Sequence, residues 1–135
     1  MTMKNNLKRI VITGGAGFIG SNLSRKLLKE GAEKILIIDD LSTGKIKNIE
    51  DLMELDEIEF IESRVEDIKN LNETLSNFDF CFHLAAGVGV QYIMENVSKA
   101  LLTNIEATHL MIESCKVNNL PILITSTSEV YGVSN

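Results

Sequence analysis

The chain of 135 residues has little proline, cysteine or aromatic side chain, and it has no tryptophan. Its single proline, Pro121, leaves long uninterrupted stretches in which helices and strands can form. The two cysteines, Cys81 and Cys115, lie in apolar segments, outside any C-x-x-C pair and away from histidines at metal-ligand spacing. We therefore assign both cysteines to the core, and we predict neither a disulfide nor a metal site.

Basic charge is also scarce, because 13 Lys and Arg residues stand against 19 Asp and Glu residues, for a formal net charge of -6. No run of Lys or Arg exceeds two residues, which disfavours electrostatic binding to nucleic acid or to an anionic membrane surface. The apolar runs are too short to span a membrane, and the amino-terminal residues lack the apolar segment of a signal peptide. These absences predict a cytoplasmic protein with small-molecule partners.

Hydrophobic residues make up 44% of the chain, enough for one domain with a core and too little for two. Short apolar runs of the length of buried strands recur along the sequence. We predict five strands, at residues 10–12, 35–38, 58–61, 78–82 and 122–124. The runs at 10–12, 35–38 and 122–124 are apolar throughout, so we expect them to be buried on both faces of a sheet.

Helical patterns separate these strands. Ile19, Leu23 and Leu27 recur every four residues, and Gly31 follows as a helix stop. The longest predicted helix spans about residues 91–118, with one face made of Val97, Leu101, Thr108, Met111 and Cys115. Alternating strands and helices predict right-handed βαβ crossovers, and therefore an α/β fold in which helices cover both faces of an open parallel sheet.

Three glycines spaced by three residues lie where the first strand must turn into the first helix. Gly14, Gly17 and Gly20 occur in TGGAGFIG, residues 13–20. Such a loop makes a tight turn, lets backbone N–H groups approach a pyrophosphate, and lets the helix pack closely on the strand. The spacing therefore predicts a dinucleotide-binding loop, which the flanking strand and helix strengthen.

The second predicted strand ends in an acid at the expected distance from this loop. Asp39 lies nineteen residues after Gly20, where a carboxylate would bind the hydroxyls of the adenosine ribose. A carboxylate there would repel a 2′-phosphate, and no arginine directly follows it, so we predict NAD rather than NADP. Lys45, in the LSTGK loop, could receive a phosphate, but we interpret it as a solvated lysine.

Four motifs in order, TGGAGFIG, DDLSTG, HLAA and STSEVYG, resemble the extended short-chain dehydrogenase/reductase family. Within it, the chain resembles the NAD-dependent sugar-nucleotide epimerases, dehydratases and decarboxylases. The resemblance implies a Rossmann-like doubly wound parallel sheet of strand order 3-2-1-4-5, ending before the sixth strand and before a substrate domain. In that order, residues 122–125 form an unpaired edge strand, through which we predict self-association.

The resemblance also implies the residues around the cofactor. They are Gly14, Gly17, Phe18, Ile19 and Gly20 at the pyrophosphate, Asp39 at the ribose, Asp67 and Ile68 at the adenine, Leu84, Ala85 and Ala86 beside the nicotinamide-side ribose, and Asn104 as a supporting residue. From the residues alone, Asp67 would be a helix N-cap, and the alanines would simply end a buried strand. A purely structural Asn104 remains an equal alternative.

The last motif, residues 126–132, follows the fifth predicted strand. The resemblance implies that Thr127 binds the reacting sugar oxygen and that Glu129 is an acid found in decarboxylases and dehydratases. Without the resemblance, the Ser/Thr cluster would be a turn. His83 is interpreted as a hydrogen-bonded histidine at a strand end rather than a ligand or base, because no second histidine or cysteine is suitably spaced.

The tyrosine-x-x-x-lysine pair that transfers protons in this family is absent, since Tyr92 and Tyr131 are followed four residues later by asparagines. We therefore expect residues 1–135 to be the NAD(P)-binding domain of a longer enzyme, inactive alone, whose substrate is a nucleotide sugar and which forms a homodimer through the long helix. A stand-alone dinucleotide-binding module with a sensing or regulatory role is the alternative. A flavodoxin-like or receiver-type domain is disfavoured, because neither explains the glycines together with Asp39.

Overall fold

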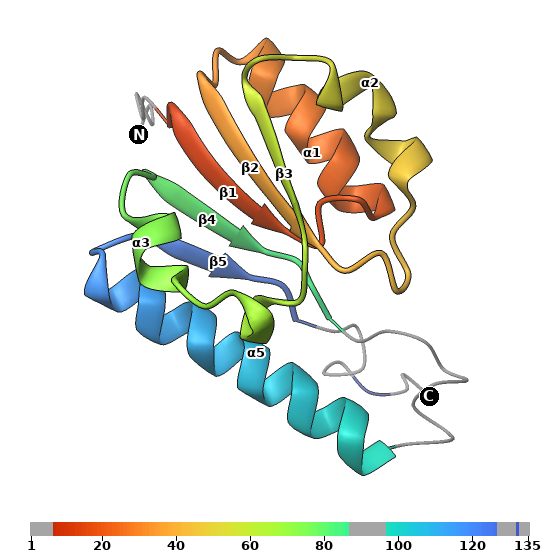
Figure 1. Ribbon diagram of the computed structural model, residues 1–135, viewed down its shortest axis with the longest axis vertical. Helices are drawn as coiled ribbons and strands as arrows, with labels where there is room; N and C mark the ends of the chain where they lie inside the picture. Colours follow the sequence, from red (N-terminus) through yellow and green to blue (C-terminus); the bar gives the residue numbers. More distant parts are fainter. Residues whose placement is uncertain (1–6, 87–96, 127–131, 133–135) are drawn as a thin grey trace.

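The computed structural model describes residues 7–86, 97–126 and 132, which form one layered α/β unit (Figure 1). In chain order the elements are β1 (Arg9–Thr13), α1 (Phe18–Lys29), β2 (Lys34–Asp39), η1 (Ile46–Asn48), α2 (Glu50–Met53), β3 (Ile58–Glu62), η2 (Val65–Asp67), α3 (Leu71–Leu75), β4 (Phe80–His83), α5 (Val97–Val117) and β5 (Ile122–Ile124). The two η elements are single 3₁₀ turns.

The five strands form one parallel sheet in the order β3-β2-β1-β4-β5. The first strand lies at its centre, where Ile10 pairs with Ile35 of β2 on one side and with Phe80 of β4 on the other. This order confirms the predicted Rossmann-like sheet. The chain first adds strands on one side of β1, as far as β3, and then adds β4 and β5 on its other side. This change of side creates a switch point between β1 and β4.

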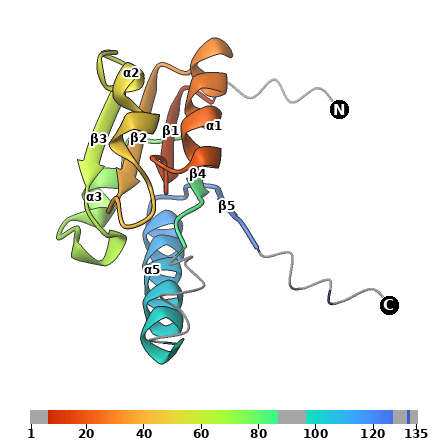
Figure 2. The same cartoon turned by 90° about the vertical axis from the view of Figure 1, so that its right-hand side faces the viewer.

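Helices cover both faces of the sheet, as Figures 1 and 2 show, with α1 and α2 on one side and α3 and α5 on the other. Alternate residues of the central strands pack into the cores on the two sides of the sheet, because successive side chains of a strand point to opposite faces. Ile10 and Ile12 belong to the cluster under α1 and α2, and Val11 belongs to the cluster under α3 and α5. All three are fully buried, which confirms that this strand is buried on both faces.

The predicted helix stop is confirmed at Gly31, which adopts φ +94° directly after α1 and its C-cap residue Glu30. The longest helix, α5, ends at Val117, and Asn119 turns the chain with φ +50°. Met111 and Cys115 are buried on its inner face, as the pattern predicted. The part of the predicted helix before Val97 lies outside the described residues.

Two strand predictions need correction. The run 122–124 is not buried on both faces, since Leu123 is 43% exposed and Ile124 is 42% exposed. The reason is its place at the sheet edge: β5 pairs with β4 on one side, and no described strand pairs with its other side. The fourth strand begins two residues later than predicted, at Phe80; just before it, the carboxylate of Asp79 accepts hydrogen bonds from the backbone N–H groups of Lys8 and Arg9.

Within the described part of the chain, no helix has both the length and the apolar character needed to cross a bilayer.

Candidate functional site

The carboxyl ends of β1, β2 and β4 lie side by side at one edge of the sheet, and each ends in a buried polar residue. These residues are Thr13, Asp39 and His83. The loop from Gly14 to Gly17 leaves β1 between its two neighbours and leads into α1. Open parallel sheets bind ligands at such a switch point, beyond the carboxyl ends of the strands.

Two of the three predicted glycines have no room for a side chain. At Gly14, which has φ +69°, an added Cβ would lie 2.8 Å from the backbone nitrogen of Ala85, so the loop runs directly against the chain leaving β4. At Gly20, an added Cβ would lie 2.5 Å from the carbonyl oxygen of Gly14. The first glycine thus makes the close turn, and the last lets α1 pack on the loop, as the spacing predicted.

The amino-terminal end of α1 offers unmatched backbone donors. Gly17 is its N-cap residue, no side chain of the described residues caps it, and the first turn contains no acidic residue. The nearby serines do not fill this role, because Ser21 donates to the carbonyl of Phe18 and Ser24 donates to the carbonyl of Gly20. Free N–H groups and the positive end of the helix dipole make this terminus suited to an anion such as a diphosphate.

Asp39 is only 7% exposed, and its carboxylate organises the loop. Its Oδ2 accepts a hydrogen bond from the backbone N–H of Ala16 at 2.9 Å, and its Oδ1 accepts one from the N–H of Leu41 at 2.9 Å. Each carboxylate oxygen can accept two hydrogen bonds, so both retain one acceptor site. The structure therefore brings Asp39 against the glycine loop with acceptor capacity left for a ribose hydroxyl.

The loop after β2 closes over the glycine loop through backbone contacts. The backbone N–H of Lys45 and the side-chain amide of Asn48 both donate to the carbonyl of Ala16, at 3.1 and 2.7 Å. An added Cβ at Gly44 would lie 2.7 Å from Asp39 Oδ1, so this loop also needs a glycine. Neither Asn48 nor Gly44 was predicted as part of the site; their signal in the sequence was the second glycine-containing turn, which follows Asp39.

Gly15 was also missed. An added Cβ there would lie 2.5 Å from Cγ2 of Ile37, a branched side chain on the neighbouring strand. The paired glycines of TGGAG carried this information, but the three-residue spacing drew attention to Gly14 alone.

An arginine lies beside Asp39 and Asp40, at the corner where the carboxyl ends of β2 and β3 meet. Backbone pairing carries β3 beyond Glu62, where the N–H of Ser63 donates to the carbonyl of Asp39. Arg64 then reaches across, and its Nε donates to Asp40 Oδ2 at 3.3 Å while its Nη1 lies 3.7 Å from Glu66 Oε1. No arginine is found among residues 40–47, directly after Asp39, but strand pairing brings Arg64 to this place from the end of β3.

Asp40 remains ionised at this corner. Burial alone would raise the pKa of Asp40, but hydrogen bonds from Ser42 and then the pairing with Arg64 outweigh it, so the pKa lies below its usual value. The Ser42 hydroxyl donates to Asp40 Oδ1 at 2.6 Å and the Ser42 N–H donates to the same oxygen at 3.0 Å.

His83 links three elements beneath the site, which confirms the interpretation of a hydrogen-bonded histidine. Its Nδ1 lies 2.7 Å from the hydroxyl of Thr13, and its Nε2 lies 3.1 Å from the hydroxyl of Thr108 on α5. Thr13 is fully buried, and its oxygen also accepts the N–H of Ala85. Burial lowers the pKa of His83, which favours the neutral ring.

The remaining predicted residues lie around the same edge. Leu84, Ala85 and Ala86 continue from β4, with Ala86 exposed, and the N–H of Leu84 donates to the carbonyl of Thr13. Asp67 is exposed in η2, and Ile68 packs against the cluster under α3 and α5.

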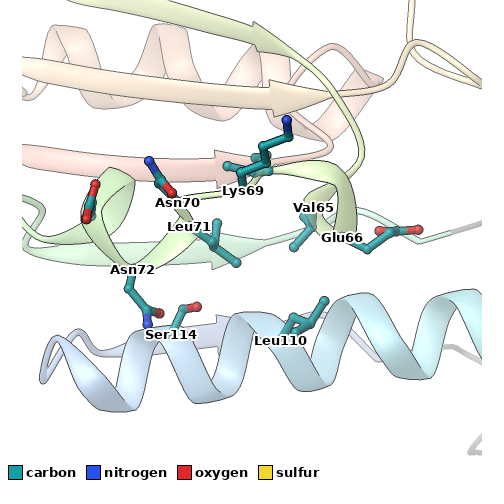
Figure 3. A pocket seen from close by; sticks show the side chains of 10 residues that line it. Val65, Glu66, Lys69, Asn70, Leu71, Asn72, Leu110 and Ser114 are labelled. Carbon is teal, nitrogen blue, oxygen red and sulfur yellow. The ribbon is translucent and has the colours of Figure 1, made fainter.

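A groove of about 350 Å³ runs between η2, α3 and α5, and Ile68 lines it. Figure 3 shows Leu71 and Leu110 pointing into the space between the two helices. Asn118 closes the helix pair by donating to the carbonyls of Asn72 and Ser114.

Three predicted residues are not placed by this structure. Thr127 and Glu129 lie outside the described residues. The backbone of Asn104 belongs to α5, but its side chain is outside the described part. Their predicted roles stay predictions.

Comparison with known proteins agrees with this geometry. The family model described as GDP-mannose 4,6 dehydratase matches residues 11–135. The chain belongs to the GDP-mannose 4,6 dehydratase family. Membership in the GDP-mannose 4,6 dehydratase family confirms the resemblance to nucleotide-sugar epimerases, dehydratases and decarboxylases that four short motifs had indicated.

Individual relatives of this family differ in the reaction that their names describe. A UDP-N-acetyl-alpha-D-glucosaminuronate decarboxylase of Bacillus cytotoxicus is 38% identical over 93% of the chain. The structure of a UDP-N-acetylglucosamine 4-epimerase from Methanobrevibacter ruminantium M1 has a TM-score of 0.83 at 33% identity over 93% of the chain. The dTDP-glucose 4,6-dehydratase DesIV from Streptomyces venezuelae, solved with NAD bound, has a TM-score of 0.86 at 28% identity over 94%. The chain spans 38%, 39% and 42% of these three proteins.

Proposed function

We propose that this chain binds NAD at the carboxyl edge of its sheet, as the cofactor-binding part of a nucleotide-sugar epimerase, dehydratase or decarboxylase. The observation that carries the proposal is the uncapped amino-terminal end of α1 beside a buried carboxylate. The helix end suits the diphosphate, and Asp39 retains an acceptor site for the adenosine ribose. DesIV, a relative of similar fold, was solved with NAD.

When bound, NAD would accept a hydride, and the residues of this chain would bind and orient the cofactor. The N–H groups of Phe18 and Ile19 would contact the diphosphate, with Gly14 and Gly20 keeping the loop close to it. Ala85 and Ala86 would leave room for the nicotinamide-side ribose. In the proposed reaction Thr127 would bind the sugar oxygen that is oxidised and Glu129 would serve as an acid.

The test is a calorimetric titration of the whole protein, as its reading frame encodes it, with NAD and separately with NADP. We expect NAD to bind and NADP to give no comparable signal. Gly17→Ala should weaken NAD binding by about tenfold, equivalent to 1.4 kcal/mol, because its methyl group would lie at the helix end. The backbone of Gly17, with φ -74°, admits alanine, and the nearest contact of the new Cβ is 3.2 Å, so the fold should persist.

A suitable control is Ser76→Ala, since Ser76 lies after α3 and donates only to the carbonyl of Glu73. This change should leave NAD binding intact. A folded wild-type protein that fails to bind NAD would contradict the proposal. Turnover of a nucleotide sugar by the whole protein would separate an enzyme from a stand-alone sensing module.

We also propose that the protein forms a homodimer through α5. This helix exposes Ile105 at 57% and Ile112 at 39%, which lie two turns apart and therefore on one side of it. Sedimentation at increasing concentration would test this, and Ile105→Lys should shift the protein toward the monomer.

A further inference from the structure

The corner between β2 and β3 contains an ion pair that neither the glycine loop nor Asp39 requires. Asp40 follows the last residue of β2, and Arg64 follows β3 by two residues. They meet because the strands are parallel neighbours, so their carboxyl ends lie side by side. The pair lies next to Asp39, the residue proposed to bind the adenosine ribose.

Charges at this corner favour a neutral hydroxyl over a phosphate. Arg64 pairs with the carboxylates of Asp40 and Glu66, and Asp39, the residue before Asp40, adds a third carboxylate to this corner. The Asp40 side chain is 29% exposed and that of Glu66 is 19% exposed, so solvent screens them only partly. Arginine is the usual ligand of a 2′-phosphate, but here its Nε is engaged by Asp40.

We propose that Asp40 selects NAD over NADP by holding Arg64 and by adding negative charge beside the adenosine ribose. This rests on the proposed NAD binding, and it names the residue that sets cofactor choice. Arg64 is the latent phosphate ligand of the corner, and Asp40 keeps it occupied. Ser42 holds Asp40 in position from the other side, through its N–H and its hydroxyl.

Removing the carboxylate of Asp40 should therefore relax the selection. In Asp40→Asn, one negative charge leaves the corner and Arg64 loses its charged partner on β2. The ratio of NADP to NAD affinity should rise by about tenfold, since a unit charge acts on a doubly charged phosphate at close range. Affinity for NAD itself should change little, because Asp39 is retained.

A double variant distinguishes selection of the cofactor from a merely structural contact between β2 and β3. In Asp40→Asn/Arg64→Gln, the guanidinium is removed as well, so the gain in NADP binding should be lost. If the pair only joined β2 to β3, both variants would lower stability and leave the affinity ratio unchanged.

The matched control is Glu59→Gln. Glu59 forms an ion pair with Lys34 at 3.2 Å between the same two strands, at their amino-terminal ends. The Glu59→Gln substitution also removes one negative charge and one ion pair between the two strands, but at the end of the strands opposite to the corner. It should leave the ratio of NADP to NAD affinity at the wild-type value.

The experiment is calorimetric titration of the whole wild-type protein and the three variants with NAD and with NADP, beside denaturant unfolding of each. A raised ratio in Asp40→Asn alone supports the inference. A ratio in Asp40→Asn equal to that in Glu59→Gln overturns it while NAD binding stands. Failure of the folded wild-type protein to bind either dinucleotide overturns the proposed function and this inference together.

Discussion

Replacement of Gly14 by alanine tests the claim that the glycine loop must touch the chain leaving β4. Two separate penalties act at this position. Its φ of +69° is disfavoured for alanine, at about 1–2 kcal/mol. Its new Cβ would also lie 2.8 Å from the nitrogen of Ala85 and 3.0 Å from Cα of the same residue, and such overpacking costs about 1–3 kcal/mol.

Gly31 isolates the first penalty. It has a similar backbone conformation, φ +94°, but an added Cβ there meets nothing within 4 Å. Gly31→Ala should therefore lose about 1–2 kcal/mol of the free energy of unfolding, from backbone strain alone. Gly14→Ala should lose about 2–5 kcal/mol, the sum of both penalties.

Urea unfolding of the two variants and the wild-type protein measures this difference, with similar slopes against denaturant showing that the free energies are comparable. Equal losses for Gly14→Ala and Gly31→Ala would refute the reasoning. They would mean that the loop moves away from Ala85 at no cost, and that close approach is not the reason for glycine at position 14.

Three further predictions concern the groups around the site. Asp39→Asn leaves one of two backbone N–H groups, those of Ala16 and Leu41, without a good acceptor. It should destabilise the protein by about 1–3 kcal/mol, measured by urea unfolding, and unchanged stability would contradict the role of the carboxylate in the loop. Burial lowers the pKa of His83, so the unfolded state binds more protons below about pH 6.5, and stability should fall as the pH drops from 7 toward 5.5. His83→Gln should flatten that fall, and an identical pH profile would exclude His83 as its source. Ile37→Ala, at a fully buried position, should cost about 2–5 kcal/mol, while the exposed Leu55→Ala should cost about 0.5 kcal/mol or less in the same assay.

The sheet was predictable because its central strands carry an unambiguous pattern. Ile10 to Ile12 and Ile35 to Ile38 are apolar at every position, which only burial on both faces explains. The same apolar composition led to the wrong prediction that residues 122–124 are buried on both faces, because apolar character alone cannot distinguish a central strand from an edge strand. Exposure there depends on which strand pairs next, and a local pattern does not contain that information.

Prediction of the glycine loop's geometry was correct because that geometry depends on local backbone. The glycine spacing identified Gly14 and Gly20 because the turn and the helix start lie within a few residues of each other. Arg64 was missed because its importance arises from strand pairing. It is 24 residues from Asp40 in the chain, and only the β2–β3 register makes them neighbours.

The central position of β1 has a consequence for the order in which the sheet forms. Ile10 pairs with Ile35, 25 residues away, and also with Phe80, 70 residues away. Closing the longer loop costs about 0.9 kcal/mol more in chain entropy, and its residues leave the ribosome later. We therefore expect the sheet to grow from the strand that is synthesised first, with β2 and β3 joining before β4. The half that carries Asp39 and Arg64 would then be assembled while the half that carries His83 is still being made.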